Sequence, residues 1–360
     1  MGTRLDLLER RPRTRAQLVN YHRRRAMARL DDPDVRQLRR LVRSLKERTP
    51  DVVYLGDSAV SLVSPTDTDR RTLVDMVMAG LEPQTDVYGL HGAGYNPAMF
   101  TQYLRAVAGM ATPPTILLSL CVRLGTMPWN RHPYFARRRS IDFMREVDLG
   151  RPARIRAAFP RSTGTEWAEH LARRHHTWVG PLTVGEYTRP LKDPEASGFS
   201  PAESARLLYA YHHGGEVEQS YLDSIEELGR SLRSIGCRAV AYQTPVPVQR
   251  GVEYFGADFS TLIRSNFAAM EAAYRRGLGP DAVVLQTGTV CTTDEFLDPD
   301  DGSEHLNQAG RAKVATMLVH GVRAARAETR AVTVLPPHGG RAPVCIPEPR
   351  VATPQRQSGR

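Results

Sequence analysis

Apolar positions follow two alternating patterns along the chain after residue 50. Short apolar runs of the kind that forms buried strands occur at 52–55, 87–90, 116–121, 239–242 and 282–285. Segments with apolar residues at helical spacing lie between and after them, at 97–107, 221–235, 258–276 and 307–322. Strands that are separated by helices form a mainly parallel sheet with helices on both faces, so the pattern predicts an α/β fold with five strands.

The first 50 residues show a helical pattern in two pieces. Asp31, Asp32 and Pro33 mark the break between them, because acidic cap residues followed by a proline are typical of a helix start. After this break, apolar residues recur at helical spacing, at positions 35, 38, 41, 42 and 45. We expect residues 1–50 to form a helical hairpin that packs on the body as an N-terminal extension.

The alternation of strands and helices is interrupted between about residues 126 and 216. This stretch holds all three tryptophans and many arginines. We interpret it as a long insertion after the third strand of an α/β domain that spans residues 51–330, and we expect a lid or substrate-binding subdomain. Residues 331–360 are rich in proline, glycine and arginine, a composition that predicts a disordered tail.

The formal net charge of +10 is concentrated at the two ends of the chain. Residues 1–50 carry 15 basic and 6 acidic side chains, and residues 341–360 carry 4 basic and 1 acidic. The remaining 30 basic side chains are balanced by 32 acidic ones. This distribution argues against a nucleic-acid-binding groove across the body, although a basic N-terminal arm could contact an acidic partner.

Signals for a membrane, for secretion and for a metal are missing from the sequence. No apolar stretch reaches the about 18 residues of a membrane span, and the first residues lack the apolar core of a secretory signal. We therefore expect a cytoplasmic protein. The four cysteines lack metal-type spacing. Arginines are frequent in the insertion, and its histidines lack zinc-type spacing, so we expect surface histidines rather than metal ligands at His170, His175, His176, His212 and His213.

The first apolar run ends in Gly56-Asp57-Ser58. A glycine at the carboxyl end of a strand allows a sharp turn, and the serine that follows stands at a helix entrance, where backbone N–H groups point outward. Such a serine can present its hydroxyl to a substrate and its own N–H to a developing oxyanion. The same three residues also make an ordinary helix cap, so this motif alone leaves both interpretations open.

A second candidate segment lies just before the final helix. His305 stands there among several acidic residues. An imidazole removes the proton from a serine hydroxyl, and a nearby carboxylate fixes its tautomer and stabilises the imidazolium. The alternative is a solvated acidic loop with a histidine at a helix start.

Taken together, the two segments resemble the SGNH (GDSL-type) superfamily of hydrolases and acyltransferases. Its first block is Gly-Asp-Ser after the first strand, and its last block is Asp-x-x-His before the C-terminal helix. The resemblance covers about residues 51–125 and 237–322. It implies Ser58 as the nucleophile and His305 as the general base. The family's oxyanion glycine matches Gly92 best and Gly94 next, and Asn96 is a further candidate for substrate binding.

Two departures from the family pattern concern the third and the last block. The family has an oxyanion asparagine after the third strand, where this chain offers Arg123. Arg123 could donate to an oxyanion or bind an anionic substrate group, or it could be held by a nearby carboxylate. Gly302 stands three residues before His305, where the family has its aspartate. We choose Asp301 as the orienting carboxylate. The alternatives are Asp298, Glu304 and a dyad in which His305 bonds a backbone carbonyl.

The resemblance implies acyl transfer or ester hydrolysis through a Ser58 acyl-enzyme, without a metal or an organic cofactor. The expected substrate is an acyl ester or acyl thioester, free or bound to a carrier, in a biosynthetic pathway. One alternative is a simple carboxylester or thioester hydrolase or a deacetylase. Another is a non-catalytic SGNH-fold binding protein, in which the two departures mark lost activity.

Overall fold

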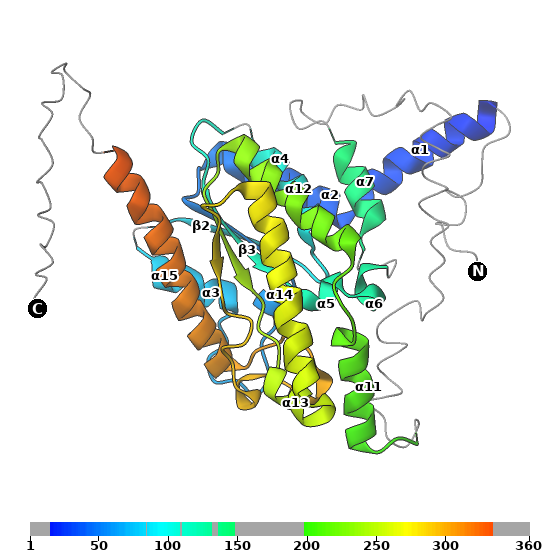
Figure 1. Cartoon of the computed structure of the whole chain (residues 1–360). Helices are drawn as coiled ribbons and strands as arrows, with labels where there is room; N and C mark the ends of the chain where they lie inside the picture. The colour runs from blue at the N-terminus through cyan, green and yellow to red at the C-terminus, as the bar shows by residue number, and fades with distance from the viewer. Residues whose placement is uncertain (1–14, 84, 109, 132–135, 148–197, 334–360) are drawn as a thin grey trace, which may run out of the picture.

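Five parallel strands form the centre of the protein (Figure 1). The computed structural model describes residues 15–83, 85–108, 110–131, 136–147 and 198–333. Its strands are β1 (Val52–Gly56), β2 (Val87–His91), β3 (Thr115–Leu120), β4 (Ala239–Gln243) and β5 (Val283–Leu285). Their order across the sheet is β2-β1-β3-β4-β5. The five strands predicted from the apolar runs are confirmed, with each end within one residue.

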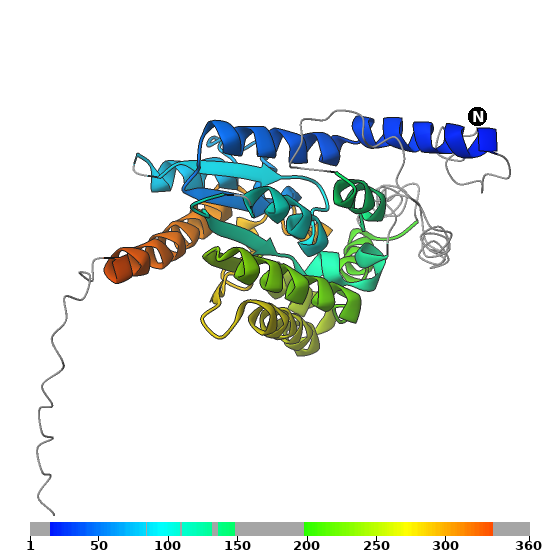
Figure 2. The same cartoon turned by 90° about the horizontal axis from the view of Figure 1, so that it is seen from above.

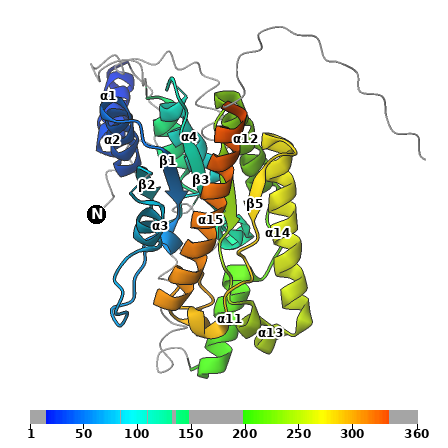
Figure 3. The ribbon, with the colours of Figure 1, turned by 90° about the vertical axis from the view of Figure 1, so that its left-hand side faces the viewer.

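Helices cover both faces of this sheet, which makes a three-layer α/β arrangement (Figures 1 and 3). One face packs against α2 (Pro33–Glu47), α4 (Pro97–Val107), α12 (Gln219–Ile235) and α14 (Ala257–Leu278). The other face packs against α3 (Leu73–Leu81) and α15 (Gln308–Thr333). Every residue of β1, β3 and β4 is buried, because a parallel strand between two helical layers meets water on neither face.

Shorter helices and 3-10 turns complete the described part of the chain. The helices are α5 (Val122–Gly125), α6 (Met127–Asn130), α7 (Arg138–Arg145), α11 (Pro201–His213) and α13 (Val248–Phe255). The 3-10 turns are η2 (Ser58–Val60), η4 (Thr293–Glu295) and η5 (Pro299–Asp301). No helix in the described part of the chain is both long enough and apolar enough to cross a membrane.

The N-terminal extension is helical, but it is not a hairpin. Asp32 caps α2 by accepting hydrogen bonds from the Asp34 and Val35 amides, and the apolar stripe of α2 is buried as expected. Helix α1 (Arg15–Asp31) continues roughly along the direction of α2 and runs beyond the body (Figure 2). The predicted hairpin is wrong because Asp32 alone separates the two helices, whereas a reversal needs a loop of about two to five residues.

The insertion is helical where the structure describes it. Helices α6, α7 and α11 belong to the stretch between residues 126 and 216, and Trp129 on α6 is buried. Residues 148–197, where the lid was expected, lie outside the described residues, as do residues 334–360 of the expected tail. Residues 331–333 of that tail continue helix α15.

Glycines allow α12 and α14 to pack closely. A methyl group on Gly277 would lie 2.2 Å from the carbonyl oxygen of Glu226, and one on Gly229 would lie 2.7 Å from the amide nitrogen of Leu278. Both obstacles are backbone atoms, which cannot rotate away. The close approach of the two helices therefore requires glycine at both positions.

We predict that Gly277→Ala lowers the free energy of unfolding by about 1–3 kcal/mol, the usual effect of overpacking. Gly215→Ala is the matched control, because a methyl group there meets nothing within 4 Å. Chemical denaturation of both variants measures the difference. Equal stability of the two variants would contradict the close helix contact.

Candidate active site

Ser58 stands at the carboxyl end of β1, where the strand turns directly into η2. The Asp57 carboxylate caps this turn by accepting a hydrogen bond from the Ala59 amide at 2.7 Å. A methyl group on Gly56 would lie 2.5 Å from the Val60 side chain, so only glycine fits at the end of the strand. The local sequence thus builds a tight turn with a half-buried serine at its start.

The position of this turn in the sheet matters as much as its shape. Strand β1 lies between β2 and β3, and the chain leaves it in one direction to form β2 and returns to its other side to form β3. Such a reversal of strand order opens a crevice at the carboxyl edge of the sheet, where α/β proteins bind ligands. Ser58 lies at that edge.

His305 reaches Ser58 from the other end of the domain. The two residues are 247 positions apart, and Ser58 Oγ lies 3.4 Å from His305 Nε2. This distance is at the long end of the hydrogen-bond range, as is common for a nucleophile and its base without substrate. The two residues chosen from the sequence as nucleophile and base are therefore brought together.

Three local contacts fix the backbone around His305. The His305 carbonyl accepts a hydrogen bond from the Leu297 amide at 2.8 Å, and Leu306 forms an antiparallel bridge with Phe296. The Asn307 side chain then caps α15 by accepting from the Ala309 and Gly310 amides. His305 thus lies between a small strand pairing and a capped helix.

The turn between β2 and α4 holds the three candidate oxyanion and substrate residues. The Gly92 amide donates to the Gly56 carbonyl at 3.4 Å, a long bond that extends the pairing of β2 with β1. Gly94 has a positive φ of 70°, which a side chain would strain. The Asn96 side chain caps α4 by accepting from the Met99 amide at 3.1 Å. All three residues have a role in shaping this turn.

Arg123 occupies a buried position between the nucleophile and base segments. Its guanidinium forms an ion pair with Glu304, with Nη2 and Oε2 2.7 Å apart, and lies over the Trp129 ring at 4.5 Å from its centroid. The Cys121 thiol donates to the other Glu304 oxygen at 3.5 Å. Arg123 is therefore held by a nearby carboxylate, one of the roles that the sequence left open. Its Nε has no hydrogen-bond partner among the described residues.

The candidate carboxylates near His305 differ in their surroundings. Glu304 is fully buried and paired with Arg123, whereas Asp298 is exposed. Asp301 is half-buried and interacts electrostatically with both Arg123 and Glu304. Gly302, three residues before His305, has a positive φ of 70°.

Two histidines of the insertion are buried, which corrects the expectation that they lie at the surface. His213 is fully buried, and its Nε2 lies 2.7 Å from the Gly302 carbonyl, to which it must donate. Burial, opposed by this hydrogen bond, lowers the pKa of His213 to about 3, so that its ring is neutral. His212 accepts a hydrogen bond from the Trp129 indole at 3.2 Å. The sequence signal for this burial is the apolar run 207–211 directly before them.

Two buried carboxylates directly precede Ser58 and His305 in the sequence. Burial raises the pKa of Asp57 to about 6; the Ala59 amide opposes this shift and the charge of Glu304 adds to it. Burial also raises the pKa of Glu304, with Arg123 opposing the shift. The Arg123 guanidinium is thus a buried cation that interacts with both Asp57 and Glu304, which directly precede Ser58 and His305.

Comparison with known proteins adds no identification. No known protein family matches the chain, and no curated protein is similar enough to be a relative. The described residues hold no cluster of histidine, cysteine, aspartate or glutamate suited to a metal ion.

The first prediction for this site concerns the buried ion pair. Arg123→Met should lower the free energy of unfolding by about 3–5 kcal/mol, because it leaves a buried carboxylate without its partner. Adding Glu304→Gln should recover part of that loss. Arg131→Met, which breaks an exposed ion pair with Glu218, is the control and should change stability by at most about 1 kcal/mol. Additive effects of the two buried substitutions would contradict the coupling.

The second prediction concerns pH. Between the ordinary pKa of 3.8 and about 6, Asp57 is ionised in the unfolded chain but protonated in the folded protein. The wild type should therefore lose roughly 3 kcal/mol of stability relative to Asp57→Asn as the pH rises through this window. Asparagine keeps the oxygen that caps the turn. Denaturation at pH 4 and at pH 6.5 measures the difference, and parallel curves would contradict the raised pKa.

Proposed function

We propose that this protein is a serine-dependent enzyme of the SGNH type that transfers or hydrolyses acyl groups through a Ser58 acyl-enzyme. One observation carries the proposal: Ser58 Oγ and His305 Nε2 lie 3.4 Å apart at the carboxyl edge of a parallel sheet. A serine hydroxyl becomes a useful nucleophile when a base within hydrogen-bond reach takes its proton. The strand order, with the serine after β1 and the histidine before the last helix, supports the SGNH type.

In the proposed reaction, His305 Nε2 takes the Ser58 proton while Oγ attacks the carbonyl carbon of an acyl ester or thioester. The carbonyl π electrons move to its oxygen, and a tetrahedral intermediate forms. When this intermediate collapses, the bond to the alcohol or thiol breaks, and the leaving group takes the proton from His305. Water, an alcohol or an amine then attacks the acyl-enzyme by the same steps in reverse.

The oxyanion needs N–H donors near Ser58. We propose the Ser58 amide, at the start of η2, together with the turn that contains Gly92 and Gly94. The Gly92 amide is already bonded to the Gly56 carbonyl, but at 3.4 Å this bond is weak enough to be exchanged for a charged oxygen. Arg123 is the candidate third donor through its Nε, while its Nη2 stays with Glu304.

The carboxylate that orients His305 is proposed to be Asp301. Glu304 already binds Arg123 and Cys121. Asp298 is exposed and lies before η5, further from His305 along the chain. Asp301 lies in the same loop as His305 and within the field of Arg123. Glu304 thus holds the loop through Arg123, and Asp301 acts on the His305 imidazole.

We predict that a fluorophosphonate probe forms a covalent adduct with Ser58, because it reacts with serines activated by a base. Mass spectrometry of the labelled peptide locates the adduct. His305→Ala should slow labelling by about 10²–10⁴-fold, the usual contribution of a general base. Turnover of a short-chain p-nitrophenyl ester and of an acyl thioester should fall in parallel.

Ser61→Ala is the matched control, because Ser61 lies in the same turn and donates to the Ser58 carbonyl. This variant should be labelled at the wild-type rate, whereas Ser58→Ala should not be labelled. An adduct on another serine would overturn the role of Ser58. Complete absence of labelling and turnover would favour a binding protein of the same fold.

A further inference from the structure

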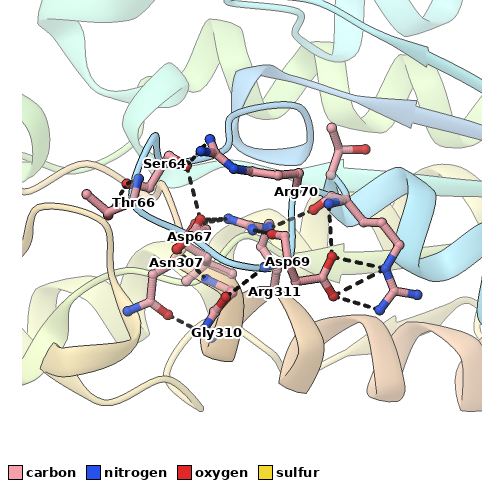
Figure 4. A network of polar contacts seen from close by, with 12 residues as sticks. Ser64, Thr66, Asp67, Asp69, Arg70, Asn307, Gly310 and Arg311 are labelled. Atoms are coloured by element: carbon pink, nitrogen blue, oxygen red, sulfur yellow. Dashed lines mark hydrogen bonds and ion pairs between the residues drawn. The ribbon is translucent and has the colours of Figure 1, made fainter.

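A buried arginine at the start of α15 joins the segment after His305 to the loop after Ser58. Arg311 is fully buried and is paired with Asp67 at 2.8 Å. It donates to three carbonyl oxygens as well, those of Asp69, Arg71 and Leu306, at 2.9–3.1 Å. Figure 4 shows this network around Asp67, Asp69 and Arg311. One side chain thus gathers four acceptors from two distant parts of the chain.

Gln308 makes a second set of contacts between the same two segments. Its side-chain oxygen accepts from the Thr68 amide and hydroxyl and from the Asp69 amide, at 2.8–3.0 Å. The backbone amide of Gln308 donates to the Asp67 carboxylate at 3.3 Å. Asp67 also accepts from the Ser64 amide at 3.1 Å, which folds the loop back on itself. The loop at 64–71 and the start of α15 therefore form one polar unit.

This unit lies close to both reacting residues along the chain. Ser64 follows Ser58 by six positions, and Arg311 follows His305 by six positions. The Leu306 carbonyl that Arg311 bonds belongs to the residue directly after His305. A shift of Arg311 would therefore move the peptide next to the imidazole.

We propose that Arg311 is a positioning residue that holds His305 at reaction distance from Ser58. This inference rests on the proposed function. Its physical basis is the 3.4 Å separation of Ser58 Oγ and His305 Nε2, which leaves little room for further displacement. A guanidinium presents several donors in a rigid plane, so it can fix four acceptors at once, which a lysine ammonium cannot do with the same geometry.

Asp67 carries a negative charge in this unit at neutral pH. Burial raises the pKa of Asp67, but hydrogen bonds from Arg311, Ser64 and Gln308 outweigh that effect and lower it overall. Asp67 is therefore ionised at neutral pH and forms its ion pair with Arg311 at 2.8 Å. Arg311→Lys keeps a positive charge beside Asp67, so we expect it to act through the position of His305 rather than through the charge balance.

The test compares Arg311→Lys with the wild type by the rate of fluorophosphonate labelling at Ser58. We expect the variant to fold and to be labelled roughly 100-fold more slowly, the usual effect of displacing a catalytic group by about 1 Å. In a His305→Ala background, Arg311→Lys should change the rate no further, because its effect acts through the imidazole. A general loosening of the fold would instead slow labelling in both backgrounds.

Arg323→Met is the matched control on the same helix, because Arg323 binds the Gly80 carbonyl away from Ser58 and should leave the rate unchanged. Gln308→Ala is the second variant, should Arg311→Lys not fold, and we expect a smaller loss that also depends on His305. Wild-type rates in both folded variants, or equal losses with and without His305, would overturn the inference. Absence of wild-type labelling would instead show that the proposed function fails, and the inference would fall with it.

Discussion

Parallel pairing of the five strands is the constraint on which the candidate site depends. Because all strands run in the same direction, the segments that follow β1, β2 and β3 emerge at one edge of the sheet. The reversal of strand order at β1 places Ser58 at the part of this edge where such sheets usually bind ligands. No local preference of the Gly-Asp-Ser turn could bring it to a histidine 247 positions away. The sheet does so by fixing where each connection begins.

A single buried cation then organises the charges beneath that edge. Arg123 follows β3 and pairs with Glu304, while Asp57 at the end of β1 lies within its field. Burying two carboxylates without a counter-ion would be strongly unfavourable, so the three side chains depend on one another. This arrangement gives Arg123 a structural role. A neutral side chain there could donate a hydrogen bond, but it could not compensate the charge of Glu304.

Gly302 has a structural role in the loop before His305. Its φ of 70° is one that a side chain rarely adopts, and a methyl group there would lie 3.0 Å from the Tyr209 ring. Its carbonyl accepts a hydrogen bond from the buried His213. The loop is therefore held at Gly302 by its backbone, through the left-handed turn and the hydrogen bond with His213.

The sequence by itself determined the strands, most of the helices and the two segments that carry Ser58 and His305. These features follow from local rules, because burial between helical layers requires apolar runs, and turns and caps require particular residues next to them. The α/β fold class could be predicted for the same reason. The direction of α1 could not, because it depends on the single residue that separates α1 from α2.

Only the tertiary structure decided which charged and polar side chains meet. The sequence left Arg123 with two roles and Glu304 with one candidate role, and their pairing depends on how β3 and the loop before α15 approach each other. His213 was expected at the surface yet is fully buried, and Arg311 gathers acceptors about 240 positions away. Such contacts carry no periodicity along the chain. They arise from the distances between elements, which local sequence patterns do not specify.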